Sequence, residues 1–265
     1  MAPADPLPRA RIMGVNVSAI TMADALRTVE DWIGRRARNY VCITGVHGVI
    51  ESQSDARLMA IHERAGMVTP DGMPLVWMTR KLGHGQTERV YGPDLMLRLT
   101  ELSAEKGYRQ YYFGGAPGLA ERLRDRLTTR FPGLAVAGTF SPPFRPSSAQ
   151  EDEEIVRMIN AARPDIVWVG LSTPKQEYWM AGHLDRIEAP VMIGVGAAFD
   201  FLAGTKRQAP AWMQKRGLEW LFRLLSEPRR LWRRYGKIVP QFMVGASLQL
   251  LRQKTALAVA PKREA

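Results

Sequence analysis

The chain has 265 residues, enough for one large domain or for a domain with an appendage, and its formal net charge is +11. Residues 1–204 hold 23 basic and 23 acidic side chains, whereas residues 205–265 hold 14 basic and three acidic ones. All of the net charge therefore lies in the tail. Such a segment favours a phosphate-bearing partner, which could be nucleic acid, an anionic lipid surface or a nucleotide.

Cysteine and histidine usage argues against a metal site. A single cysteine, Cys42, excludes a disulfide framework and a multi-cysteine metal site, and it fits a reducing compartment. The four histidines show no metal-binding spacing.

The N-terminal residues lack the apolar stretch of a signal peptide, and no apolar run is long enough to cross a membrane. We therefore expect a protein of the cytosol or of the cytosolic face of a membrane, with no metal or cofactor.

The first elements are an arm, a strand and a helix. Residues 1–9 are rich in Pro and Ala and predict a flexible arm. The run "IMGVNV" predicts one strand. A helix then begins near Thr21, because Thr21 and Asp24 stand at capping-box spacing and apolar residues recur on one helical face after them.

Strand-like and helix-like patterns alternate from there to residue 204. The predicted strands are "NYVCIT", "GMVT", "RQYYFGG", "LAVAGTF", "DIVWVGLS" and "PVMIGVGAA". The predicted helices are "DARLMAIHERA", a segment from about Pro74, "PDLMLRLTELSAEKG", "PGLAERLRDRLTTRF", the acidic end of the loop "SPPFRPSSAQEDEE", and "KQEYWMAGHLDRI". Strands that are apolar on both faces and separated by amphipathic helices are typical of a parallel sheet covered by helices. Residues 10–204 therefore predict a Rossmann-like α/β body.

Residues 205–265 predict a basic amphipathic helical appendage. Pro228 opens a second helical segment, in which the spacing separates a cationic face from an apolar one. The cationic face holds Arg230, Arg233, Arg234 and Lys237. Arginine suits bidentate binding of phosphate. The apolar face continues through "IVPQFMVGASLQLL", which is too short to span a bilayer but suited to lie in its interface.

Candidate ligand-binding residues follow the predicted strands, because ligands of open α/β sheets bind beyond the carboxyl ends of the strands. These residues are Thr44, Asp71, Gly114, Gly115, Gly170 and Gln176. In "FGGAPG" the first two glycines are adjacent, where the dinucleotide motif GxGxxG has a spacer between them. Contact with a phosphate or ribose and a tight strand-to-helix turn therefore both remain open for this motif.

Asp71 and Gln176 have the clearest chemical potential. Asp71 follows "GMVT" with apolar residues on either side, so partial desolvation would raise its pKa and suit a general base; a turn aspartate in Pro-Asp-Gly is the alternative. Gln176 opens a helix, where free N–H groups attract anions, and it is a ligand candidate. Glu177 beside it would complement the helix dipole, and His47 fits a structural loop histidine.

Six separated motifs carry a resemblance to a known family. They are "TPDGMPLVW", "YGPDLM", "FGGAPG", "VGLSTPKQEYW", "GVGAAFDFLAGTKRQAPAW" and "GLEWLFRLLSEPRRLWRRY". From about Gly14 to Tyr235 the sequence resembles the WecG/TagA/CpsF family of bacterial glycosyltransferases, glycosyltransferase family 26. The resemblance implies a Rossmann-like fold of the GT-E type with a C-terminal membrane-binding appendage. It also implies an inverting enzyme that moves a sugar from a UDP-sugar to a polyprenyl-diphosphate-linked sugar, as a peripheral protein on the cytoplasmic face of the inner membrane.

Site roles follow from the same resemblance. It places the catalytic base on Asp71, a pocket-lining role on Thr44, and contacts with the diphosphate on the appendage arginines Arg223, Arg230 and Arg233. Many members carry an Asn shortly after that Thr, whereas Val46 and His47 stand here. The transferred sugar, whether glucose, N-acetylmannosamine or another hexose, is therefore left open. Because no Asp-x-Asp motif occurs, we expect arginines and helix N-termini to take the place of a metal ion.

Two other classes of protein compete with this interpretation. A protein that binds nucleic acid through its basic tail is one, although the apolar helical stripe and the lack of a known nucleic-acid motif argue against it. An NAD-dependent oxidoreductase is the other, and the irregular glycine spacing of "FGGAPG" disfavours it.

Overall fold

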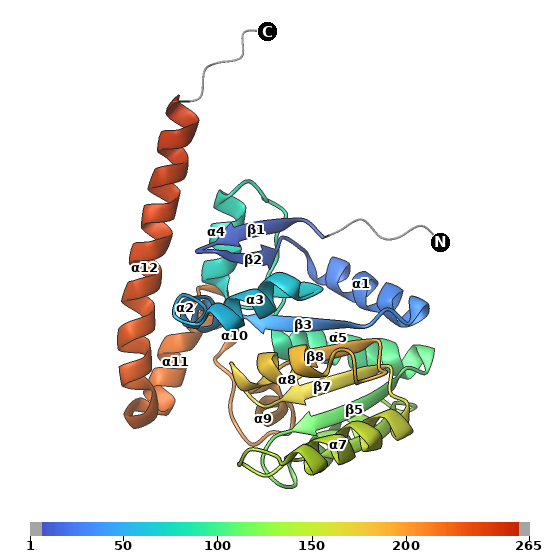
Figure 1. Cartoon of the computed structure of the whole chain (residues 1–265). Coiled ribbons are helices and arrows are strands. Elements are labelled where there is room, and N and C mark those ends of the chain that lie inside the picture. The colour runs from blue at the N-terminus through green and yellow to red at the C-terminus, as the bar shows by residue number, and fades with distance from the viewer. Residues whose placement is uncertain (1–6, 260–265) are drawn as a thin grey trace.

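The computed structural model describes residues 7–259 as a helix-covered body with one long helix, α12 (Pro228–Val259), running along one side of it (Figure 1). The body is built on a six-stranded sheet. Its strands are β3 (Asn39–Thr44), β4 (Met67–Pro70), β5 (Arg109–Gly114), β6 (Ala135–Phe140), β7 (Ile166–Gly170) and β8 (Val191–Gly194).

The sheet has the strand order β4-β3-β8-β7-β5-β6, and all of its pairings are parallel. This confirms the predicted parallel α/β body. In the sheet, β4 lies on one side of β3, whereas β5 to β8 lie on the other side of β3. The strand order therefore reverses between β3 and β8, which is where open α/β sheets form a ligand-binding crevice.

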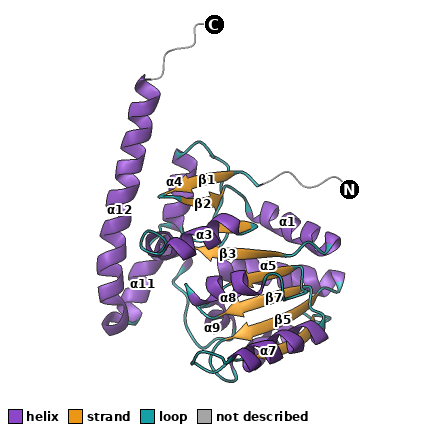
Figure 2. Ribbon diagram, in the orientation of Figure 1, coloured by secondary structure: helices purple, strands orange, loops and turns teal. Residues whose placement is uncertain are grey.

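Helices cover both faces of the sheet (Figure 2). One apolar cluster joins the sheet to α1 (Met22–Arg35), α5 (Gly92–Lys106), α6 (Leu119–Arg130) and α9 (Ala198–Leu202). The other joins it to α2 (Val46–Glu51), α3 (Ala56–Arg64), α4 (Met73–Lys81), α7 (Ala149–Ala162), α8 (Lys175–His183) and α12. The sequence predicted most of these helices, and the capping box of Thr21 and Asp24 opens α1 as expected.

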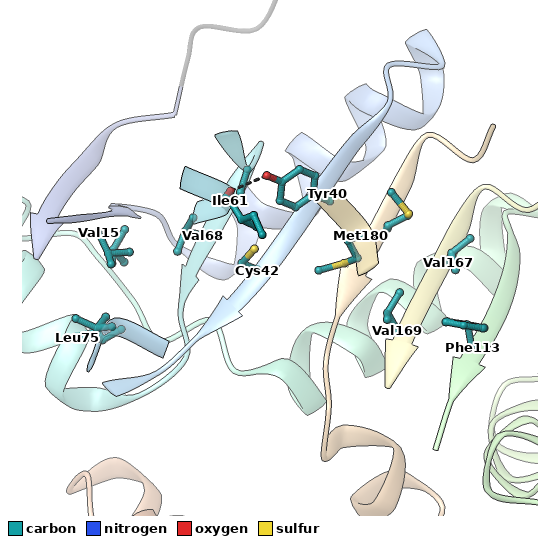
Figure 3. Close-up of a cluster of buried hydrophobic side chains, with 14 of the residues drawn as sticks. Val15, Tyr40, Cys42, Ile61, Val68, Leu75, Phe113, Val167, Val169 and Met180 are labelled. Atoms are coloured by element: carbon teal, nitrogen blue, oxygen red, sulfur yellow. Dashed lines mark hydrogen bonds between the residues drawn. The ribbon is translucent and has the colours of Figure 1, made fainter. Parts of the chain in front are cut away.

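Figure 3 shows part of the second cluster, where side chains from β3, β4, β7 and the helices meet. Cys42, Val68 and Val169 are fully buried. The one polar group of Tyr40 is satisfied, because its hydroxyl donates to the Ile61 carbonyl at 2.6 Å. Burial on both faces explains why the strands read as continuous apolar runs rather than as alternating ones.

The prediction of one strand over "IMGVNV" is wrong. The chain instead forms a hairpin of β1 (Arg9–Ile12) and β2 (Val15–Ser18). Met13 and Gly14 make its two-residue turn with φ of 46° and 88°, the left-handed backbone that such hairpins require. Most of the predicted arm, residues 1–6, lies outside the described residues, and its last residue, Arg9, already belongs to β1.

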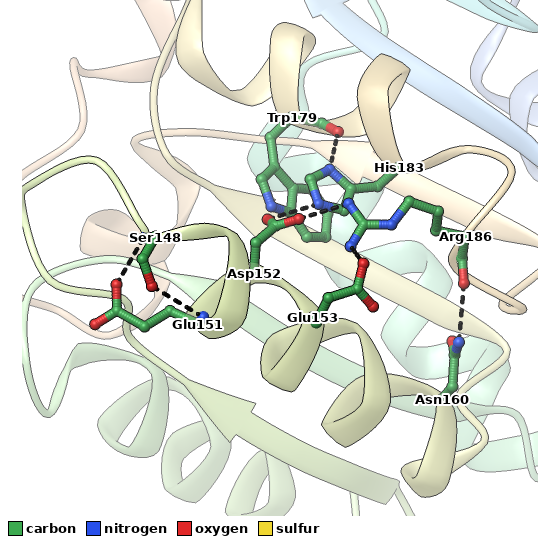
Figure 4. Close-up of polar contacts among 8 residues, drawn as sticks. All are labelled: Ser148, Glu151, Asp152, Glu153, Asn160, Trp179, His183 and Arg186. Carbon is green, nitrogen blue, oxygen red and sulfur yellow. Dashed lines mark hydrogen bonds and ion pairs between the residues drawn. The ribbon is translucent and has the colours of Figure 1, made fainter.

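Polar contacts between α7 and the end of α8 hold α8 in place (Figure 4). Asp152 of α7 accepts from His183 Nε2 at 2.9 Å and pairs with Arg186, which also reaches Glu153 at 2.7 Å. The α7 helix begins after Ser148 in the acidic end of the long loop, as predicted. These contacts fix the helix whose first turn carries Gln176.

The described part of the tail is helical, as predicted, with α10 (Ala211–Lys215), α11 (Glu219–Ser226) and α12. Pro228 opens α12. One face of α12 packs on the body through Ile238, Phe242 and Ala246, which are buried. Gln249 then ties the helix to the hairpin turn, because its Oε1 accepts from the Met13 N–H at 2.9 Å. The described part of the tail therefore packs against the body.

Candidate active site

A cavity of about 680 Å³ lies between the carboxyl edge of the sheet and the helices of the tail. Its volume is typical of a site for a small organic ligand. The body contributes the ends of β3 and β4 and the first turn of α8. The tail contributes α11 and α12. Of the residues predicted for the site, the cavity is lined by Thr44, Asp71, Gln176 and Arg223.

Asp71 follows β4 directly and sits at the N-terminus of α5. Its Oδ1 accepts from the Gly92 N–H at 3.0 Å, while no described residue donates to Oδ2. Burial raises the pKa of Asp71 to about 6, Glu219 adds to the rise, and Arg89 and the Gly92 N–H partly offset it. A carboxylate that titrates near neutrality, with one oxygen free in a cavity, has the properties of a general base.

Thr44 ends β3 beside Asp71, as expected of neighbouring parallel strands. Its carbonyl accepts from the Asp71 N–H at 3.0 Å, and its hydroxyl lies 3.1 Å from His62 Nε2. Burial lowers the pKa of His62 to about 4, so the ring is neutral at physiological pH. Since Nδ1 faces the Leu58 carbonyl at 3.1 Å, Nδ1 carries the proton and Nε2 accepts from Thr44. The Thr44 hydroxyl is therefore held by His62, with the Cys42 carbonyl 3.4 Å away, while the residue lines the cavity.

Arg89 links the base to the tail. Its Nε donates to the Asp71 carbonyl at 2.6 Å, and its two terminal nitrogens donate to Gln214 at 2.9 Å and Glu219 at 2.6 Å. Glu219 also accepts from the hydroxyl of Tyr91 at 3.0 Å. Arg89 and Glu219 were not among the site residues predicted from the sequence. Arg89 stands just before the motif "YGPDLM" and Glu219 lies inside "GLEWLF", and these motifs were the signal that could have identified them.

Some arginines of the tail line the cavity, and others lie outside its lining. Arg223 and Arg234 line the cavity, together with Arg216. Arg230 instead pairs with Glu227 at 2.7 Å, and Arg233 lies over the Trp232 ring at 5.3 Å. Three arginines, Arg223, Arg230 and Arg233, were expected at the diphosphate. Of these, only Arg223 lines the cavity. Arg234, which was not among the three, lines it as well.

His47 accepts a hydrogen bond from Arg234. The Arg234 guanidinium donates to Nδ1 of His47 at 2.5 Å, and Nε2 of the same ring lies 3.4 Å from Glu51. Burial, with Arg234 and Arg223 nearby, lowers the pKa of His47 to about 4, so a neutral ring accepts this hydrogen bond. His47, predicted as a structural loop histidine, instead lies in the first turn of α2 and connects that helix to α12 in the lining of the cavity.

The three candidate glycines lie outside the cavity lining. A Cβ on Gly114 would stand 2.7 Å from the Gly170 backbone, and one on Gly170 would stand 2.8 Å from the Phe199 ring. The Gly115 N–H donates to the Gly170 carbonyl at 3.0 Å. Close approach to the β7 backbone thus explains Gly114 without a ligand, and positive φ values of 81° and 80° explain Gly115 and Gly118.

Neither a metal cluster nor a membrane span is found in the described part of the chain. Within residues 7–259, no three His, Cys, Asp or Glu side chains gather as metal ligands would. Over the same residues, none of the helices combines the length and apolarity needed to cross a bilayer. The α12 helix does carry exposed apolar side chains, namely Trp232, Met243, Val244, Leu248 and Leu251, of which Met243 also lines the cavity.

An α/β body with a free carboxylate facing cationic side chains suits an enzyme that transfers a group from a phosphorylated donor. Comparison with known families agrees. The model of the glycosyl transferase WecG/TagA/CpsF family matches residues 10–256, so the chain belongs to this family and is a glycosyltransferase.

Two curated relatives carry the name N-acetylglucosaminyldiphosphoundecaprenol N-acetyl-beta-D-mannosaminyltransferase. The protein from Bacillus spizizenii is 29% identical over 184 residues, which cover 69% of each chain. The one from Staphylococcus aureus is 25% identical over 236 residues, which cover 88% of this chain and 89% of the relative.

Proposed function

We propose that this glycosyltransferase moves a hexose or N-acetylhexosamine from a UDP-sugar to a polyprenyl-diphosphate-linked sugar, with inversion and without a metal ion. The names of its relatives support a lipid-linked acceptor with a diphosphate group. The observation that carries the proposal is the Asp71 carboxyl, whose free Oδ2 faces a cavity that Arg223 and Arg234 also line.

In the proposed reaction Asp71 Oδ2 takes the proton of the attacking acceptor hydroxyl. The acceptor oxygen forms a bond to the anomeric carbon from the face opposite UDP, and the bond from that carbon to the UDP oxygen breaks. UDP leaves with the electron pair. Arg223 and Arg234 offset the charge that develops on the diphosphate, a task for which fixed cationic groups are suited.

The same proposal places the protein on the cytoplasmic face of the inner membrane, where the acceptor's lipid is anchored, in the synthesis of exopolysaccharide or another cell-surface glycan. Two features of the tail support it: the net charge of residues 205–265 and the exposed apolar side chains of α12, which suit an anionic interface. Family membership disfavours a nucleic-acid-binding protein and an NAD-dependent oxidoreductase.

The test is transfer by the purified full chain. UDP-glucose, UDP-N-acetylglucosamine and UDP-N-acetylmannosamine are each supplied with a short-chain polyprenyl-diphosphate-linked N-acetylglucosamine, with EDTA or with Mg²⁺. The expected result is a disaccharide product of inverted anomeric configuration from at least one donor, formed equally in EDTA. No transfer from any of the three donors, or transfer that needs the metal ion, would contradict the proposal.

A further inference from the structure

The cavity extends beyond Asp71 as a groove between α4 and α12. The α4 helix begins shortly after Asp71, and its side of the groove is one helical stripe, since the lining residues recur at i, i+4 and i+8. These residues are Met73, Pro74, Trp77, Met78 and Lys81. The α4–α12 groove therefore starts at the proposed base and follows α4 away from it.

The α12 helix forms the other side of the groove with a stripe of the same spacing. The apolar members of this stripe are Ile238, Val239, Phe242, Met243, Ala246 and Leu250. The stripe extends about 18 Å at the rise of an α-helix. Both helices run from the site to the β1–β2 hairpin, because α4 packs on β1 and Gln249 of α12 binds the hairpin turn (Figure 1). The groove is therefore elongated, which suits a chain better than a ring.

Large apolar side chains in the groove are open to solvent, so a ligand can reach them. The exposed fractions of Trp77 on α4 and Met243 on α12 are 44% and 62%. Apart from Lys81 and Ser247, the described lining residues of α4, and those of α12 beyond Tyr235, are apolar. Covering such side chains is favourable, because it removes apolar surface from water. The lining therefore indicates that the groove takes an apolar part of a substrate.

The α4–α12 groove is separate from a second apolar stripe on α12. Val244, Leu248 and Leu251 are also exposed, but they lie outside the cavity lining. That second stripe suits a membrane surface. One helix thus presents one apolar face to the surroundings and another to the inside of the cavity.

Of the two proposed substrates, only the acceptor has a part that matches the groove. The uridine, the sugars and the diphosphates all carry polar groups that an apolar lining would leave without hydrogen bonds. A prenyl chain is apolar and elongated. It is joined to the acceptor's sugar through a diphosphate, so it must lead away from the site when a hydroxyl of that sugar faces Asp71. The groove leads away from Asp71 in the same manner.

We propose that the α4–α12 groove binds the first isoprene units of the acceptor's polyprenyl chain, against Trp77 of α4 and Met243 of α12. The inference rests on the proposed function and deepens it, because the acceptor is then bound by its lipid as well as by its sugar. The tail accordingly has a role beyond holding the protein at a membrane. It forms one side of the path by which the lipid-linked sugar reaches the base.

The experiment compares two ligands that share a diphosphate and differ in the lipid. Titration calorimetry on the full chain, without membrane or detergent, uses farnesyl diphosphate and inorganic pyrophosphate. Met243→Glu places a charge in the groove. Val244→Glu is the matched control, because Val244 is the next residue of α12 and is 59% exposed, but lies outside the cavity lining. Trp77→Ala tests the α4 side, and thermal melting establishes that each variant is folded.

The wild-type chain should bind farnesyl diphosphate about tenfold or more tightly than pyrophosphate. Met243→Glu and Trp77→Ala should each lose most of that preference, with affinity for pyrophosphate within about twofold of wild type. Val244→Glu should keep the preference. Equal affinity of the wild-type chain for the two ligands, no loss in Met243→Glu, or an equal loss in Val244→Glu would overturn the inference.

This outcome is distinguishable from a failure of the proposed function. Calorimetry needs neither a sugar donor nor turnover, so the groove is tested even if no UDP-sugar supports transfer. Conversely, transfer to the lipid-linked acceptor by a chain without any preference for farnesyl diphosphate would retain the proposed function and remove the groove from acceptor binding.

Discussion

Arg89 and Glu219 form an ion pair of 2.6 Å between the catalytic body and the tail, and Nε of the same arginine holds the Asp71 carbonyl. The exposed fractions of the two side chains are 14% and 23%, so the pair is shielded from solvent screening more than a surface pair would be. The docking of α11 and the position of the proposed base therefore depend on one guanidinium.

Glu219→Gln should move the acidic limb of the activity profile to lower pH. The pKa of Asp71 is raised first by burial and second by Glu219, and removing that charge also leaves Arg89 less neutralised. Both changes favour the ionised, active form of Asp71. The measurement is the pH dependence of kcat/KM, for which the wild-type rate should fall as pH drops through about 6. An unchanged or raised midpoint in the variant would show that Glu219 does not act on Asp71.

The effects of His47→Ala and Arg234→Ala on kcat/KM should be non-additive. His47 holds the Arg234 guanidinium at 2.5 Å, so a His47 variant loses activity mainly by releasing Arg234. We expect each single variant to lose about tenfold in kcat/KM, and the double variant to lose little more than Arg234→Ala alone. Independent, multiplicative losses would mean that His47 has a role apart from Arg234.

Ending the chain after Glu227 should greatly slow transfer and leave the body folded. This truncation removes α12, and with it Arg234 and one wall of the cavity, but keeps the six-stranded sheet and its helices. We expect a rate loss of about 10²-fold or more, since a fixed charge at the leaving group is removed. A chain that ends after Gln253 is the control, because it keeps every cavity-lining residue up to Leu250. Circular dichroism checks the fold, and full activity without α12 would exclude it from the site.

Asp71→Asn should raise the free energy of unfolding at pH 8 but not at pH 4. Since the folded-state pKa of about 6 exceeds the unfolded value of 3.8, the native state binds more protons between these values. The stability of the wild-type chain therefore falls as pH rises through this window, by up to about 3 kcal/mol. Asparagine carries no such cost. Urea titrations at both pH values measure the difference, and a variant less stable than wild type at pH 8 would contradict the raised pKa.

The sequence was enough to predict the sheet, and four of the nine predicted site residues, Thr44, Asp71, Gln176 and Arg223, line the cavity. Runs that are apolar on both faces identify parallel strands, and parallel strands place their carboxyl ends at one edge, which is why Thr44 and Asp71 meet as predicted. The hairpin was missed because Met13, a non-glycine residue, adopts a positive φ, so the usual glycine or asparagine signal is present only at Gly14.

The remaining site residues depend on tertiary packing. Whether Arg230, Arg233 or Arg234 faces the cavity is set by which face of α12 is buried, and Leu231 and Ile238 lie on that face. Arg234 lies three and four residues from these two, on the same helical stripe, so the spacing already indicated the inward arginine once the docked face was known. Arg89 and Glu219 come together from positions 130 residues apart, a separation that no local pattern reveals.

The most direct test of the account is the transfer rate of Asp71→Asn at saturating UDP-sugar and lipid-linked acceptor. Asp94→Asn is the control, because Asp94 is an exposed carboxylate in the first turn of α5, nearby but outside the cavity lining. We expect kcat of the Asp71 variant to fall about 10²-fold or more, while the Asp94 variant stays near wild type. A folded Asp71→Asn enzyme with near wild-type turnover would contradict it.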